Sequence, residues 1–286
     1  MRRWTVEKIW ATAPDGGTAP VRCVPPRGGT GTGPPPVVVV VPGLGVAAGY
    51  YELFARALAA KGLAAAVCEV RGQGESRCCG DRYGYRTIVE DDLPAVLAAV
   101  RERFGGGPRY LLGHSIGGQL ATLYGAAGGR GLDGLILVAS GTNYHRVHGR
   151  GMSAILLLGA LAGGAGPSGR ADPFGAFAAH SRRFHRDWAH VVRTGRFEPH
   201  GATVDYEALI ARMTVPVLAI RQHADRLAPH RSVEHLLAKM RAARVTRWTA
   251  PTEGHNAWIV DPRATTDRIH RWITESRAGR AIPAVR

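Results

Sequence analysis

The sequence has no hydrophobic run long enough to cross a bilayer. A spanning helix needs about 20 consecutive apolar residues, whereas the longest apolar stretch, residues 152–166, is shorter and is interrupted by glycines. The N-terminal segment MRRWTVEKIWATAPDGG carries basic residues but lacks the apolar core of a signal peptide. We therefore expect no membrane span and no secretory leader.

Cysteine is also scarce, and its spacing excludes the common cysteine-based sites. The four cysteines are Cys23, Cys68, Cys78 and Cys79. They form neither a C-x-x-C redox motif nor a zinc pattern. The central histidines, which are His145, His148, His180, His185 and His190, do not follow the H-E-x-x-H spacing either. We expect a cytoplasmic protein with free thiols and with no metal or cofactor.

Lysine is nearly absent from a strongly basic chain. Of 37 basic residues only Lys8, Lys61 and Lys239 are lysines, and the net charge is +15. Such a charge suits nucleic acid or anionic lipid. The arginines, however, are scattered and accompany no zinc finger, homeodomain or RNP1-like pattern, and their excess together with Ala and Gly is typical of GC-rich coding. We therefore expect no nucleic-acid partner and keep a basic binding protein as a third hypothesis.

Short buried strands alternate with amphipathic helices along most of the chain. Residues 37–41 are five consecutive valines, and an unbroken β-branched run favours a strand buried on both faces. Helices are predicted at 50–61, 88–104, 116–125 and 262–275. The further predicted strands are 4–11, 21–24, 63–70, 109–113, 134–139, 215–221 and 245–250. This alternation predicts an α/β fold with a mostly parallel central sheet flanked by helices.

The alternation of strand and helix disappears between residues 141 and 207. A stretch this long is unusual as a bare loop, so we predict an inserted helical cap over residues 141–207. The α/β core would then comprise residues 1–140 and 208–286, with a loose tail from Ala278.

A nucleophile elbow is predicted at GHSIG, residues 113–117. This G-x-S-x-G motif follows a predicted strand and opens a predicted helix, which is the context that gives the motif meaning. Flanking glycines allow strand and helix to pass closely, and the turn presents Ser115 at the carboxyl end of the sheet. The alternative is an ordinary serine in a glycine-rich turn. We predict that Ser115 is the nucleophile.

A serine hydroxyl needs a base, and the base needs an orienting acid. In this architecture the acid and then the histidine follow the serine along the chain. Asp225 comes after the strand at 215–221, and His255 comes after the strand at 245–250. Singly, a loop aspartate is usually a turn residue and a loop histidine is usually solvated. In this order we expect Ser115, Asp225 and His255 to converge as catalytic residues.

An oxyanion hole requires two backbone N–H groups. One is expected from Ile116, the residue after the nucleophile. The second is expected from Leu44 in the loop after the valine strand, because Gly43 lets the backbone turn inward. Gly45 is the near alternative.

These motifs together resemble the α/β-hydrolase-fold proteins, and within them the serine aminopeptidase and monoacylglycerol-lipase-like group of small cytoplasmic hydrolases. GHSIGGQ resembles that group's elbow, RGQGES at 71–76 its R-G-x-G-x-S turn, and Asp225 with Pro229 its acid loop. Gly254-His255-Asn256 resembles its histidine loop. The family's usual His-Gly before the oxyanion residue is Pro42-Gly43 here, so the glycine is retained but the histidine that braces the loop is missing.

Substrate-binding residues are harder to predict. We expect them to be Tyr50, Tyr51, His114, Leu157 and Trp188. Leu156, Leu158, Phe174 and Phe177 are further candidates for an acyl pocket. The competing interpretation is that the cap residues form only the cap's own core.

The resemblance implies a hydrolase that cleaves a carboxylic ester or thioester of a small molecule through an acyl-enzyme. One alternative is an acyltransferase or cyclase that uses the same acyl-enzyme. Another is a non-catalytic protein that binds a ligand under the cap.

Overall fold

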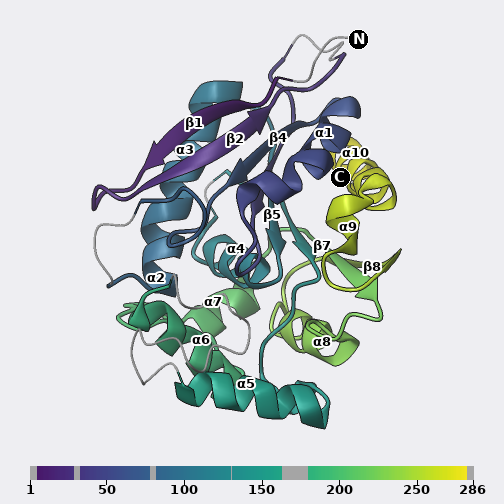
Figure 1. The fold of residues 1–286 in the computed structure, drawn as a ribbon. Coiled ribbons are helices and arrows are strands. Elements are labelled where there is room, and N and C mark those ends of the chain that lie inside the picture. The colour runs from purple at the N-terminus through teal and green to yellow at the C-terminus, as the bar shows by residue number, and fades with distance from the viewer. Residues whose placement is uncertain (1–4, 29–32, 78–81, 130, 163–179, 282–286) are drawn as a thin grey trace, which may run out of the picture.

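The computed structural model describes residues 5–28, 33–77, 82–129, 131–162 and 180–281. Strands within these ranges form one sheet in the order β1-β2-β4-β3-β5-β6-β7-β8 (Figure 1). The strands are β1 (Glu7–Thr12), β2 (Thr18–Val24), β3 (Val37–Val41), β4 (Ala64–Cys68), β5 (Arg109–His114), β6 (Gly134–Val138), β7 (Val217–His223) and β8 (Val245–Glu253). Pairings β1–β2 and β2–β4 are antiparallel, and the others are parallel. The predicted mostly parallel sheet flanked by helices is confirmed.

The valines of β3 divide between two hydrophobic cores, one on each face of the sheet. Val38 and Val40 pack with α1 (Glu52–Ala60), α9 (Ala257–Val260) and α10 (Arg263–Ala281). Val37, Val39 and Val41 pack with α3 (Leu93–Phe104), α4 (Ile116–Ala126) and other elements of the opposite face. Because side chains alternate along a strand, an unbroken apolar run is required when both faces are covered.

The parallel strands bring their carboxyl ends to one edge of the sheet. The loop after β3, the turn after β5 and the loops after β7 and β8 therefore lie along the same edge. These loops carry Leu44, Ser115, Asp225 and His255 respectively.

Helices occupy the region predicted as a cap. They are α5 (Arg150–Ala162), α6 (Arg182–Thr194) and the first two residues of α7 (Tyr206–Arg212), preceded by a 3₁₀ turn, η3 (His145–Val147). In Figure 1, α5 and α6 lie together beyond the carboxyl end of the sheet. The expected boundary at residue 208 falls inside α7, which packs against α4 of the core. That the region is a separate unit stays a prediction.

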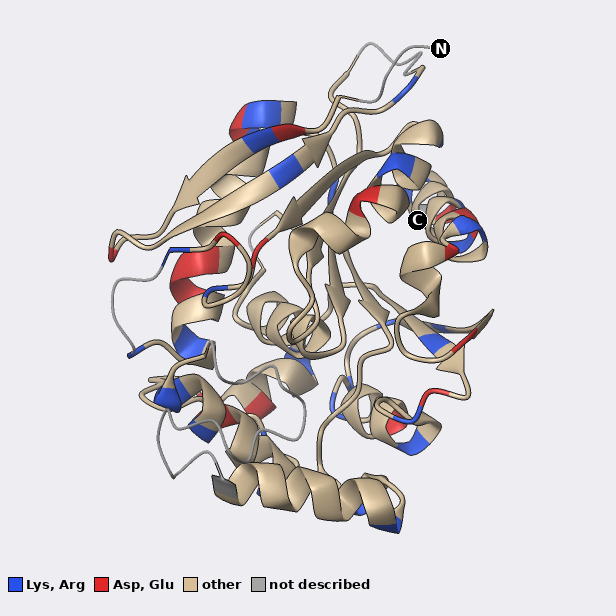
Figure 2. Ribbon diagram, viewed as in Figure 1, with Lys and Arg blue, Asp and Glu red and all other residues tan. Residues whose placement is uncertain are grey.

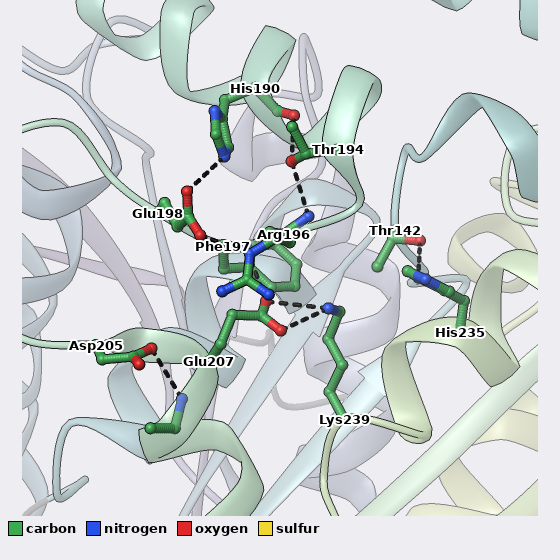
Figure 3. Close-up of polar contacts among 11 residues, drawn as sticks. Thr142, His190, Thr194, Arg196, Phe197, Glu198, Asp205, Glu207, His235 and Lys239 are labelled. Atoms are coloured by element: carbon green, nitrogen blue, oxygen red, sulfur yellow. Dashed lines mark hydrogen bonds and ion pairs between the residues drawn. The ribbon is translucent and has the colours of Figure 1, made fainter.

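An ion pair ties the segment after α6 to the core. Glu207 on α7 accepts a hydrogen bond from the Phe197 N–H at 2.8 Å, and its Oε2 lies 2.7 Å from Lys239 Nζ (Figure 3). Lys239 follows α8 (His230–Leu237). The pair is largely buried, with the two side chains 17% and 13% exposed.

Several predicted boundaries differ from the structure. The helix at 50–61 starts with a 3₁₀ turn, η1 (Ala48–Tyr51), and the helix at 88–104 is preceded by α2 (Tyr85–Thr87) and starts with a π turn, η2 (Ile88–Asp92). The π turn ends just before Pro94, which has no N–H to donate. The prediction of a loose tail from Ala278 is wrong for residues 278–281, because α10 continues to Ala281. Cys78, Cys79, Phe174 and Phe177 lie outside the described residues.

No helix among the described residues is long and apolar enough to span a membrane. Figure 2 shows Lys and Arg on strands, helices and loops throughout the molecule, without concentration on one element. The basic residues are therefore dispersed in space as they are in sequence.

Candidate active site

Ser115 occupies a strained turn between β5 and α4. Its φ of 55° and ψ of −121° lie outside the usual regions for a residue with a side chain. The Ser115 N–H donates to the Val138 carbonyl at 3.1 Å, and Ser140 Oγ donates to the Ser115 carbonyl at 2.8 Å. These bonds from the neighbouring strand and the residue beyond it hold the turn in its unfavourable conformation.

The glycines of the motif are required by close packing. A Cβ on Gly113 would overlap the backbone of Gly118, and a Cβ on Gly117 would overlap the carbonyl oxygens of Val41 and Pro42. The G-x-S-x-G pattern thus lets α4 start directly against β5 and β3.

His255 and Asp225 are joined by a buried hydrogen bond. His255 Nδ1 lies 2.8 Å from Asp225 Oδ2, and the Asp225 side chain is only 1% exposed. Asp225 Oδ1 accepts the N–H groups of Leu227 and Ala228, each at 2.9 Å. Because both carboxylate oxygens have partners, the carboxylate is fixed, and it orients His255 through Nδ1 so that Nε2 is left for another partner.

Ser115 and His255 line the same cavity, whose volume is about 170 Å³. The other lining residues are Gly43, Leu44, Val46, His114, Ile116, Asn143, Met152, Leu156, Trp188, Leu227 and Asn256. Apolar side chains from α5 and α6 therefore face the reactive polar groups at the edge of the sheet.

Hydrogen bonds in the loop after β3 distinguish between the candidate oxyanion donors. The Gly43 N–H donates to Tyr51 Oη at 3.0 Å, the Gly45 N–H to Gln73 Oε1, and the Val46 N–H to the Gly43 carbonyl at 3.2 Å. The N–H groups of Leu44 and Ile116 have no partner among the described residues. Leu44 and Ile116 thus each offer an N–H group that is unpaired among the described residues, and both residues line the cavity. The N–H of Gly45, the alternative donor, is already bonded to Gln73.

Gly43 is needed for a different reason from the one predicted. Its φ is not in the left-handed region, whereas Gly45 has a φ of 71°. A Cβ on Gly43 would instead lie 2.9 Å from His114 Nδ1. The glycine therefore permits close approach to His114, and the left-handed turn belongs to Gly45.

Tyr51 and His114 form a buried hydrogen-bond chain behind the cavity. Tyr51 Oη accepts the Gly43 N–H, so its own proton is available for His114 Nδ1, which lies 2.7 Å away. His114 Nε2 then carries the ring proton and donates to the His255 carbonyl at 3.3 Å. Burial, and after it the nearby His255, lower the pKa of His114 well below its usual range, which keeps the ring neutral. The chain connects the loop after β3 to the loop that holds His255.

Only some of the expected substrate-binding residues line the cavity. Trp188 and His114 line the cavity. Tyr50 does not, because its side chain points to solvent at the start of α1 and the residue is 72% exposed. Tyr51 is fully buried behind the cavity wall, and Leu157 packs against the hydrophobic core, while its neighbour Leu156 lines the cavity.

Several lining or supporting residues were not predicted. Gln73 lies in RGQGES, so the motif was noticed but not its contact with Gly45. Asn143 has no local signal, because it follows β6 in a segment without a recognisable pattern. Among the described residues, no group of three His, Cys, Asp or Glu side chains is arranged to hold a metal ion.

Solved structures with the same architecture cover nearly the whole chain. One is DcsB in complex with its substrate analogue, with a TM-score of 0.67, 15% identity, and coverage of 96% of this chain and 100% of that one. A putative lipase (lip1) from Acinetobacter baumannii AYE has a TM-score of 0.66, 14% identity, and coverage of 96% and 93%. Est1E from Butyrivibrio proteoclasticus has a TM-score of 0.61, 14% identity, and coverage of 95% and 99%. At these identities the likeness establishes the α/β-hydrolase fold.

A family model described as Hydrolase_4, serine aminopeptidase, S33, matches residues 32–262. The match includes the elbow, the acid loop and the histidine loop. The chain therefore belongs to this serine aminopeptidase family and is a serine hydrolase of the α/β-hydrolase fold.

Proposed function

We propose that the protein hydrolyses a carboxylic ester or thioester through an acyl-enzyme on Ser115. The observation that carries the proposal is one cavity lined by Ser115, by His255 bonded to Asp225, and by Leu44 and Ile116, whose N–H groups lack partners within the described part of the chain. Each requirement of acyl transfer has a matching group there.

In the first half-reaction, Ser115 Oγ attacks the carbonyl carbon while His255 Nε2 takes the hydroxyl proton. The carbonyl π electrons move to oxygen and form a tetrahedral intermediate. When that intermediate collapses, the bond to the leaving group breaks, and the leaving alcohol or thiol receives the proton from His255. Asp225, bonded to Nδ1, holds the imidazole in the required tautomer and stabilises the imidazolium.

In the second half-reaction, water replaces the leaving group. His255 takes a proton from water as its oxygen attacks the acyl carbon, and it returns that proton to Ser115 Oγ when the ester bond to the enzyme breaks. The products are a carboxylic acid and the free enzyme.

The oxyanion is assigned to the N–H groups of Leu44 and Ile116. The N–H groups of Gly43 and Gly45 donate to Tyr51 Oη and Gln73 Oε1, so the loop is braced on either side of Leu44 although the family's usual histidine is missing. Ile116 begins α4, so the partial positive charge of the helix N-terminus adds to its donor. The donors are thus oriented before the substrate binds.

The experiment compares wild type with Ser115→Ala, using a fluorophosphonate probe and p-nitrophenyl esters of increasing acyl length. We expect covalent labelling to disappear and turnover to fall by about 10³-fold or more in Ser115→Ala. Ser153→Ala is the control, because that hydroxyl donates to the His145 carbonyl and the residue does not line the cavity.

Absence of labelling in a folded wild-type protein would contradict the proposal. For a protein that is labelled and turns over, ¹⁸O-water tests the second half-reaction. An acid product that carries ¹⁸O supports hydrolysis, whereas a product without it indicates transfer or cyclisation.

A further inference from the structure

A buried amide next to the elbow has its orientation fixed by its neighbours. Gln119 lies on α4 four residues after Ser115, and it is almost completely buried. Its Nε2 donates to the Gly141 carbonyl at 2.8 Å and to Asn143 Oδ1. A carbonyl oxygen can only accept, so the contact with Gly141 identifies which end of the Gln119 amide is nitrogen. Both Nε2 hydrogens are then in use.

The other end of Gln119 is consistent with this orientation. Its Oε1 accepts the Tyr85 hydroxyl at 3.4 Å. Tyr85 is fully buried, and burial raises the pKa of its phenol well above the usual range, so the group is a protonated donor. A flipped Gln119 would instead place its oxygen against the Gly141 carbonyl oxygen, and both of these groups only accept.

The hydrogen bond from Gln119 determines which end of the Asn143 amide is free. Because Gln119 donates to Oδ1, the Nδ2 end with its two hydrogens is directed away from Gln119. Nδ2 has no hydrogen-bond partner among the described residues. It is also not fully buried, because it is absent from the buried side-chain atoms that lack a partner. Asn143 lines the cavity together with Ser115. The cavity therefore contains an oriented, unpaired amide donor.

The surroundings make this donor selective. The other cavity-lining residues from the predicted cap are Met152, Leu156 and Trp188. A ligand that fills an apolar pocket without bonding to a polar group of the protein leaves that polar group desolvated and without a hydrogen bond. This cost lowers the affinity for such a ligand. The cavity is only about 170 Å³ in volume, and both Asn143 and Ser115 line it. Asn143, bonded to Gln119, is thus near the carbonyl that Ser115 attacks.

We propose that Asn143 Nδ2 donates a hydrogen bond to an oxygen on the third carbon of the acyl chain, three bonds from the scissile carbonyl carbon. The preferred substrates are then 3-oxoacyl or 3-hydroxyacyl thioesters or esters rather than plain hydrocarbon acyl groups. This inference rests on the proposed hydrolase function and adds a substrate class to it.

The test uses N-acetylcysteamine thioesters of butanoic, 3-hydroxybutanoic and 3-oxobutanoic acid. The measured quantity is the ratio of kcat/KM for each oxygenated probe to that for the butanoyl probe. Asn143→Asp keeps an oxygen for Gln119 but replaces the free donor by an acceptor. Because a ketone oxygen can only accept, we expect this variant to lower the ratio for the 3-oxobutanoyl probe by about 10-fold relative to wild type. The 3-hydroxyl can donate to the new carboxylate, so the 3-hydroxybutanoyl ratio should fall less in this variant. Differences in intrinsic reactivity between the probes cancel in this comparison.

Asn256→Asp is the matched control. It makes the same change of charge and shape at the other asparagine that lines the cavity. We expect the added charge in both variants to change kcat/KM for all three probes. In Asn256→Asp, however, the ratio of kcat/KM between oxygenated and butanoyl probes should stay within about twofold of wild type. Asn143→Ala, which leaves neither a donor nor an acceptor on the side chain, should lower the ratio for both oxygenated probes.

Fluorophosphonate labelling of each variant separates the possible failures. Labelled variants whose ratio equals that of wild type overturn the assignment of Asn143 and leave the hydrolase proposal intact. An equal fall of the ratio in Asn256→Asp also overturns it, because added charge alone would then explain the result. A wild-type protein that is not labelled overturns the proposed function itself.

Discussion

His114 uses its two ring nitrogens for two different loops. Nδ1 accepts from Tyr51, which in turn holds Gly43, and Nε2 donates to the carbonyl of His255. The ring can make both bonds only when it is neutral, because a protonated imidazole has no acceptor. One buried residue thereby links the loop after β3, which carries the proposed oxyanion donor Leu44, to the loop of the proposed base.

Tyr51→Phe should impair turnover more than substrate binding. The change leaves the Gly43 N–H without an acceptor and His114 Nδ1 without a donor. We expect kcat for p-nitrophenyl butanoate to fall by about 10- to 100-fold with little change in KM, since the oxyanion interaction develops in the transition state. Steady-state kinetics measures both parameters.

Tyr50→Phe is the matched control for this prediction. The same hydroxyl is removed from the preceding residue, whose side chain is exposed to solvent. Its kinetics should match wild type. A loss of equal size in both variants would show that the bracing role of Tyr51 is wrong.

Stability should fall in mild acid because of His114. The folded protein keeps this imidazole neutral, whereas the unfolded chain binds a proton below about pH 6.5. The unfolded state then binds more protons, so the free energy of unfolding decreases as the pH falls, by up to about 1.4 kcal/mol per pH unit from this residue. The free energy of unfolding, measured by denaturant titrations at several pH values between 7 and 5, should fall less steeply with decreasing pH for His114→Gln than for wild type. Equal slopes would contradict the prediction.

At the scale of elements, the elbow depends on how closely α4 approaches β3 and β5. Gly117→Ala would place a methyl group against two backbone carbonyl oxygens, which cannot move without shifting β3 or the loop after it. We expect the free energy of unfolding to fall by about 2–4 kcal/mol. Chemical denaturation measures this change.

A glycine in open space provides the comparison for Gly117. Gly151 lies in α5, and nothing is near its missing Cβ. Gly151→Ala should raise the free energy of unfolding by up to about 1 kcal/mol, because alanine has the higher helix propensity. Equal effects of the two substitutions would show that packing at the elbow is not the cause.

At the scale of the whole molecule, the segment after α6 is held by the buried pair Glu207–Lys239 (Figure 3). Glu207→Gln keeps an oxygen for the Phe197 N–H but leaves Lys239 without its counter-charge. We expect a loss of about 1–3 kcal/mol in the free energy of unfolding, between the values for surface and fully buried pairs. Thermal or urea unfolding measures it.

The exposed pair Arg196–Glu198 in the same region is the control. Its side chains are 53% and 47% exposed, so Glu198→Gln should cost less than about 1 kcal/mol. A larger effect from Glu198→Gln than from Glu207→Gln would contradict the assignment of Glu207 as the anchor of this segment.

Patterns within short segments predicted much of the architecture. The valine run predicted β3 with its bounds, and G-x-S-x-G predicted the turn at Ser115. Both depend on interactions between near neighbours, namely β-branched side chains in an extended chain and glycines in a sharp turn. The order of Asp225 and His255 behind parallel strands was sufficient to predict that they meet, and their side chains are 2.8 Å apart.

Other features depend on residues far apart in the sequence. Leu44 rather than Gly45 is the free donor because Gln73, 28 residues away, takes the Gly45 N–H. Tyr51 is buried and Tyr50 exposed because adjacent side chains in the 3₁₀ turn before α1 point about a third of a turn apart, and only that of Tyr51 faces the core. Asn143 is oriented by Gln119 from another element. The sequence by itself determined the fold class and the sharp turn at Ser115, the proposed nucleophile, since near-neighbour sterics impose them. Only the tertiary structure decided which N–H groups and side chains remain free in the cavity, because each hydrogen bond is settled by a partner that folding brings from elsewhere.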